Sequence, residues 1–150
     1  MLVTIASTPN ANPSVALPYP IPFNSKVYLR GYSCAVASQN IRHGGIVVQI
    51  QELAKENISS ECIMSSQYPH NRLELIIDPT WPNTQIVFEH PKLLLENSRL
   101  PINQFTYNLY YYDGTPITGD AYTTNTADTS EKAILILHLH VVINKVAAGN

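Results

Sequence analysis

Residues 102–112 read INQFTYNLYYY, and residues 133–143 read AILILHLHVVI. Both runs are rich in the aromatic and β-branched residues that are typical of β-strands. Asp113-Gly114 follows the first run and leads into Thr115-Pro116-Ile117, a pattern typical of a hairpin turn with a returning strand. This part of the chain therefore predicts antiparallel β-structure.

Earlier in the chain, similar runs are separated by turns that contain glycine or proline, and no segment has the periodicity of an amphipathic helix. The predicted strands are residues 26–36, 46–51, 72–77 and 84–89. We expect the last of these to end at His90-Pro91. Residues 92–97 are interpreted as a connector, with one helical turn or a short edge strand as the alternatives. The pattern predicts an all-β protein, a single antiparallel β-sandwich of jelly-roll-like form.

Alternation within residues 26–36 predicts which side chains share a face of the sheet. Tyr28, Arg30 and Tyr32 are expected on one side, with Val27 and Leu29 on the other. Gly31 interrupts this run and marks either a bulge or a point where another backbone approaches closely.

Residues 1–25 contain no charged side chain and are rich in proline. Proline fixes φ and lacks an amide donor, which excludes a helix or a central strand. We expect residues 1–25 to form an extended arm, with an edge strand at residues 1–6, and residues 26–150 to form the sandwich. The apolar side chains of the arm need cover, either from their own sheet edge or from a neighbouring subunit. Removal of the arm is expected to abolish assembly and to leave the fold intact.

The charge content excludes several classes of function. The net charge is −2, and the nine Lys and Arg residues are scattered, so no nucleic-acid partner is expected. No apolar run reaches the roughly 20 residues of a membrane span. Charged residues make up 13% of the chain, about half the usual ~25%, which indicates a surface that packs against other protein. A merely neutral surface of Asn, Gln, Ser and Thr is the alternative.

Few residues are candidates for catalysis or metal binding. Cys34 and Cys62 are interpreted as reduced, buried thiols of a chain made in the cytosol. His138 and His140 share one face of a strand and are the only candidate metal ligands, although a histidine pair at the surface or in an interface explains them as well. Motifs for a nucleophile or a phosphate cradle are missing, so neither enzymatic activity nor a cofactor is expected.

Tyrosine is the most informative residue type for binding. Phe105, Tyr107, Leu109 and Tyr111 alternate toward one face, which we predict to be core. Tyr110 and Tyr112 lie on the opposite face, where they suit a protein interface or a sugar-binding platform, or only close the edge of a sandwich. The polar loop at residues 118–132 is a further candidate recognition or packing loop.

The segments 105–110 and 113–117, together with the terminal strand around Leu137-His138-Leu139-His140, resemble the end of small β-sandwich structural proteins of double-stranded DNA viruses. The uncharged arm is similar to capsid arms that lace subunits together. The resemblance implies a minor capsid or penton-type protein, made in the host cytoplasm and located in the virion. Its partners would be copies of itself, as a homo-oligomer, or other capsid proteins. The residues of the chain that we expect at such an interface, from their own apolar and aromatic character, are Tyr19, Ile21, Phe23, Tyr110 and Tyr112. A carbohydrate-binding or lectin-like module is the alternative function.

Overall fold

The computed structural model describes residues 1–36, 45–52, 72–75, 83–95, 101–111, 113–120 and 132–144. Within these ranges the regular structure consists of strands, apart from a 3₁₀ stretch at residues 51–52, which confirms the all-β prediction. The strands are β1 (Leu2–Ala6), β2 (Ser14–Ile21), β3 (Ser25–Val36), β4 (Ile46–Ile50), β5 (Arg72–Leu75), β6 (Asn83–Leu95), β7 (Ile102–Tyr110) and β8 (Ala133–Ile143).

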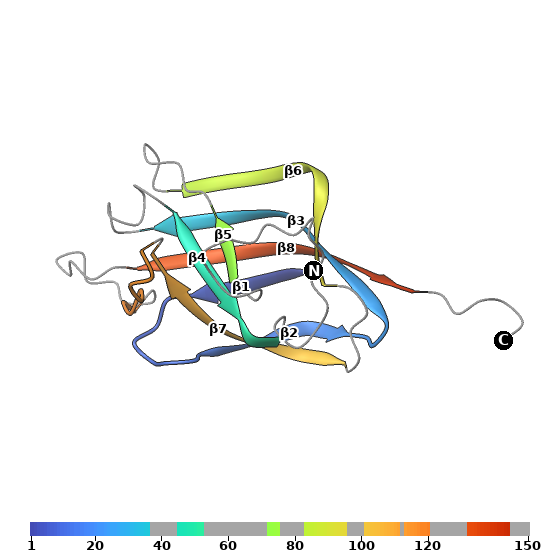
Figure 1. Ribbon diagram of the computed structural model, residues 1–150, viewed down its shortest axis with the longest axis horizontal. Coiled ribbons are helices and arrows are strands. Elements are labelled where there is room, and N and C mark those ends of the chain that lie inside the picture. The colour runs from blue at the N-terminus through green and yellow to red at the C-terminus, as the bar shows by residue number, and fades with distance from the viewer. Residues whose placement is uncertain are drawn as a thin grey trace, which may run out of the picture.

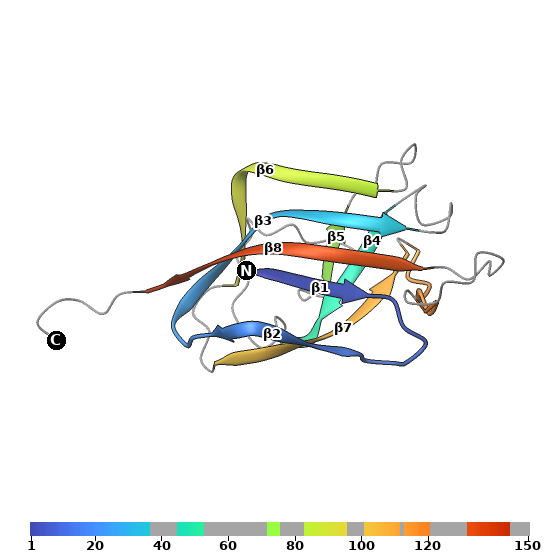
Figure 2. The same ribbon diagram turned by 180° about the vertical axis from the view of Figure 1, so that it is seen from behind.

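The strands form two four-stranded sheets that pack face to face (Figure 1). One sheet has the order β1-β8-β3-β6 and the other the order β2-β7-β4-β5, and every pair of neighbours is antiparallel. Figure 2 views the molecule from the side of the first sheet. An antiparallel two-sheet sandwich is therefore the architecture of the described chain.

Strand pairing is nested along the chain. β1 pairs with β8, β2 with β7, β3 with β6, and β4 with β5. The chain thus behaves as one long hairpin whose two arms run side by side. Additional pairing of β3 with β8 and of β4 with β7 closes the two sheets. The first and last strands become neighbours, with Leu2 opposite His138.

The core lies between the sheets and is filled by alternating side chains of both. Phe105, Ile5, Leu29 and Leu95 are among the largest side chains that are fully buried. As predicted, Phe105, Tyr107 and Leu109 of β7 face this core, and Tyr111 packs against it. On β8 the buried positions are Ala133, Leu135, Leu137 and Leu139.

The predicted faces of β3 are correct up to Arg30 and wrong beyond it. Val27 and Leu29 are buried and Arg30 is exposed, but Tyr32 is buried with 3% of its surface exposed. The reason is a bulge. Leu29 pairs with Leu139 and Gly31 pairs with His138, so between these two pairs β3 has one residue more than β8. The extra residue shifts the alternation and turns Tyr32 into the core. The bulge expected at Gly31 is confirmed.

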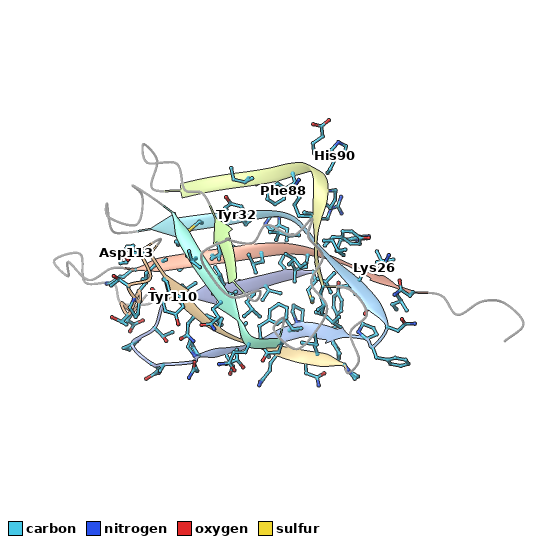
Figure 3. The ribbon with its side chains drawn as sticks, in the orientation of Figure 1. Lys26, Tyr32, Phe88, His90, Tyr110 and Asp113 are labelled. Carbon is cyan, nitrogen blue, oxygen red and sulfur yellow. The ribbon has the colours of Figure 1, made fainter. Side chains whose placement is uncertain are left out.

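The expected end of a strand at His90-Pro91 is wrong, because β6 continues to Leu95. β6 is an edge strand, and its register against β3 jumps from Lys92 opposite Leu29 to Val87 opposite Gly31. The residues between bulge out of the ladder, where the missing amide of Pro91 costs no hydrogen bond. The strand bends sharply in this region (Figure 1), and His90 points away from the body of the molecule (Figure 3).

Residues 1–25 are built into the sandwich. The expected edge strand at residues 1–6 is confirmed as β1, and β2 forms an edge of the other sheet. The register of β2 shifts between Ala16 and Ile21, a stretch that contains Pro18 and Pro20. In this single chain the stretch packs on its own domain, which is one of the two arrangements anticipated for it.

The turn after β7 forms as predicted. The backbone N–H of Gly114 donates to the Tyr111 carbonyl at 3.0 Å, and Gly114 adopts a φ of 91° that suits glycine. Asp113 Oδ1 accepts from the Thr115 N–H at 2.8 Å. This hydrogen bond lowers the pKa of the exposed Asp113 carboxyl below its ordinary value of 3.8. The return is short, with Pro116 opposite Tyr110 in a single bridge.

Candidate functional sites

One broad surface of the molecule carries no formal charge. Three cross-strand rows run over the outer side of the β1-β8-β3-β6 sheet, and none of their positions is Asp, Glu, Lys or Arg. In strand order β1, β8, β3, β6, the rows are Leu2, His138, Gly31, Val87; Thr4, Ile136, Ser33, Gln85; and Ala6, Ile134, Ala35, Asn83. We call this surface the uncharged face.

The uncharged face exposes large apolar side chains. Leu2 is 59% exposed and Val87 72% exposed at the two ends of one row, and Ile134 and Ile136 are half-buried in the other two rows. An antiparallel sheet with one face in water normally presents polar and charged side chains there. A surface that combines exposed apolar side chains with an absence of charge is a feature of contact surfaces.

His138 and His140 lie on the outer side of β8. His138 is half-buried within the uncharged face, next to Leu2 in the register, and His140 is exposed beyond it. The His140 ring lies 6.5 Å from the Tyr28 ring, centroid to centroid. Among the residues that the structure describes, no group of three or more His, Cys, Asp or Glu side chains could hold a metal ion. The geometry places the pair on the outer side of the sheet.

The predicted contact residues near the N-terminus separate into two groups. Ile21 is fully buried in the core of its own chain, so it is not available to a partner. Tyr19 and Phe23 are 52% and 63% exposed, and both lie toward the β2–β3 turn. Ser25 stabilises this turn, because its hydroxyl donates to the Pro22 carbonyl.

Tyr110 is half-buried, and its hydroxyl donates to Gln49 Oε1 of the neighbouring strand β4 at 3.1 Å. Its ring therefore lies along the sheet and contributes to a pocket, described below. Tyr112 lies outside the described residues, and so does most of the predicted recognition loop at residues 118–132.

Cys34 faces the core from β3 and is 3% exposed, as a free thiol. Burial raises the pKa of this thiol to about 12, because the thiolate would lose its hydration. A neutral buried thiol is a poor nucleophile, so Cys34 is a packing residue. Cys62 lies outside the described residues.

The pocket lies at the end of the sandwich where β1 passes into β2. Its volume is about 320 Å³. It is lined by residues 6–13, by residues 107–110 of β7 and by residues 116–118 of the hairpin return. Of the tyrosines predicted for binding, the structure places Tyr110 here. Tyr110 and Asp113 lie toward the same end of the molecule in Figure 3.

Sequence reasoning missed both the uncharged face and the pocket. Each combines strands that are far apart in the sequence, so neither appears as a local motif. The low fraction of charged residues was the one signal of the uncharged face. No described helix has the length and apolar character needed to cross a bilayer. Comparison of the chain with family models, with curated proteins and with solved structures found no match.

Proposed function

We propose that the protein is a structural subunit of a virion, of minor capsid or penton type, that acts by assembling with copies of itself. In this proposal the protein also contacts other capsid proteins. It is made in the host cytoplasm and is located in the virion. The subunit performs no chemistry in this proposal. Its function is to present complementary surfaces at fixed angles.

The nested pairing of the strands is the observation that carries this proposal. Two four-stranded sheets in the orders β1-β8-β3-β6 and β2-β7-β4-β5 match an eight-stranded hairpin rolled into a sandwich. This is the pattern of a jelly roll, an architecture that viral capsid and lectin domains use. The pairing therefore supports the jelly-roll assignment, which in turn favours these two classes of protein.

The uncharged face favours assembly over a solitary role. An interface core is depleted of charge, and a lysine or glutamate within it carries a desolvation cost that a neutral side chain avoids. The edge strands of this sheet also favour contact through the face over pairing between the edges of two subunits. β1 is short, and β6 carries a bulge with Pro91, which is unfavourable for pairing of edge strands.

A charge placed in the uncharged face tests the proposal. We expect the wild-type protein to form a defined oligomer in sedimentation velocity and native mass spectrometry. Val87→Lys adds a charge at the most exposed apolar position of the face. Burial of that unpaired charge should raise the dissociation constant at least about tenfold, equivalent to ~1.4 kcal/mol.

Ala16→Lys is the matched control, because Ala16 is exposed on β2 of the opposite sheet. It adds the same charge and should leave the oligomer unchanged. A wild-type protein that stays monomeric at its highest soluble concentration contradicts assembly through this face. Detection of the chain by mass spectrometry in purified virus particles distinguishes a virion subunit from a free oligomer.

A further inference from the structure

The pocket beside β7 has a wall that is fixed at both ends. At its start, Ser7 exchanges hydrogen bonds with Ala133 of β8: Ser7 N–H donates to the Ala133 carbonyl at 2.8 Å, and Ser7 Oγ accepts from the Ala133 N–H at 2.9 Å. At its end, the Tyr107 N–H donates to the Pro13 carbonyl at 2.9 Å. The segment between these anchors, residues 8–13, lines the pocket.

A pair of asparagine side chains also holds this wall against β7, next to the anchor at Pro13. Asn108 Nδ2 donates to Asn12 Oδ1 at 2.7 Å, and Asn108 Oδ1 accepts from the Asn12 backbone N–H at 3.1 Å. Gln51 Nε2 adds a longer contact to Asn12 Oδ1, at 3.4 Å. Asn12 adopts a φ of 53°, a left-handed conformation that asparagine tolerates better than most residues. The polar wall is therefore formed before any ligand arrives.

The lining is uncharged and combines apolar side chains, among them Pro9, Ala11 and Pro116, with hydrogen-bonding groups. None of the described residues that line the pocket is charged. Asn10, Asn12 and Asn108 supply amides, and Thr8 and Thr118 supply hydroxyls. An amide offers two N–H donors and two acceptor lone pairs, so the Asn12–Asn108 pair leaves capacity for a ligand. Tyr110, half-buried, adds an aromatic surface.

We propose that this pocket binds an uncharged saccharide unit. Its volume of about 320 Å³ falls at the lower end of the ~300–1,000 Å³ typical of ligand sites, which suits one or two sugar rings. Sugar hydroxyls both donate and accept, as amides and hydroxyls of the lining do. An anionic ligand would lose its hydration here without meeting a cation, which disfavours phosphates and carboxylates.

This inference does not depend on the assembly function, because the pocket lies at one end of the sandwich and the uncharged face lies across the outer side of one sheet. An assembling subunit and a free module can both carry such a site. It also gives the lectin-like alternative a defined location, in which Tyr110 acts together with the asparagines of the β1–β2 connection.

Titration of the full chain with simple sugars tests the site. The probes are the methyl glycosides of glucose, galactose, mannose and N-acetylglucosamine, followed by amide chemical shifts in two-dimensional NMR. We expect saturable shifts at residues 107–110 and at the non-proline residues among 8–13 with at least one of the four. Glucose 6-phosphate and glucuronic acid are the charged comparisons, and we expect their binding to be at least about tenfold weaker than that of the best neutral glycoside.

Two alanine variants provide a matched pair. Ala11 lines the pocket and is exposed, whereas Ala16 is exposed on β2 away from it. Ala11→Trp should fill the pocket and weaken binding at least about tenfold, and Ala16→Trp should leave the affinity within about twofold. Unfolding in urea reports whether each variant remains folded.

Three results overturn the proposal. The first is the absence of saturable shifts with all four glycosides. The second is saccharide binding that survives Ala11→Trp in a folded protein. The third is an Ala11→Trp variant with a changed oligomeric mass and an unchanged response to sugars, which assigns the pocket to contact between copies of the chain. Since the Val87→Lys experiment measures mass without sugar, failure of one proposal is distinguishable from failure of the other.

Discussion

At the scale of single residues, Gly31 controls the packing of β3 between its two neighbours. A Cβ atom at this position would lie 2.3 Å from the Ile86 carbonyl oxygen and 3.1 Å from Val87 Cα, both of them backbone atoms of β6. The two strands approach so closely only because residue 31 has no side chain. The bulge at the same point turns Tyr32 and Cys34 into the core.

Gly31→Ala is therefore expected to destabilise the protein by about 1–3 kcal/mol, because a methyl group would force β3 and β6 apart. The urea midpoint of unfolding measures this change. Ser33→Ala is the control on the same strand, since Ser33 is half-buried on the outer side, and its effect should stay within about 0.5 kcal/mol. Equal stability of the two variants would contradict the close approach at Gly31.

At the scale of elements, β7 ties one sheet to the other through Tyr107. The hydroxyl of Tyr107 donates to the Ala6 carbonyl at 2.9 Å and accepts from the Ala6 N–H at 3.3 Å, at the end of β1. Both groups are buried, so water cannot replace the tyrosine. The same contact fixes the chain where it leaves β1 and enters the wall of the pocket.

Tyr107→Phe is expected to lower the free energy of unfolding by about 1–3 kcal/mol, because it leaves buried polar groups of Ala6 without this partner. Chemical denaturation followed by tyrosine fluorescence and circular dichroism measures the loss. Tyr110→Phe serves as the control on the same strand: its half-buried hydroxyl contacts a side chain, Gln49, and its removal should cost no more than about 1 kcal/mol. A larger loss for Tyr110→Phe would refute the role given to Tyr107.

At the scale of the whole molecule, residues 1–25 supply one edge strand to each sheet. Val3, Ile5, Leu17 and Ile21 bring apolar side chains from this segment into the core. Burial of such side chains contributes about 1.5–3 kcal/mol each. Their sum is comparable to the 5–15 kcal/mol by which a typical domain is stable. The segment is thus a structural part of the sandwich.

Deletion of residues 1–25 is consequently expected to unfold the chain, in contrast to the separable arm that the sequence indicated. Loss of cooperative unfolding in circular dichroism would show this. The double variant Tyr19→Ser, Phe23→Ser changes two exposed side chains of the same segment and should preserve the fold. If the truncated chain retains a cooperative transition, the structural role of β1 and β2 is refuted.

The sequence alone determined the local features of this protein. Alternation in residues 102–112 and 133–143 is set within each strand, so it correctly predicted β7, β8 and the core face of β7, and Asp113-Gly114 correctly predicted the turn. Only the tertiary structure decided which strands pair, because pairing joins segments as distant as Leu2 and His138. For the same reason, several other features became visible only in the folded molecule. They are the side chains of β3 that face the core after Gly31, the continuation of β6 past Pro91, the burial of Ile21, the uncharged face and the pocket. Each of them depends on a neighbouring strand that lies far away in the sequence.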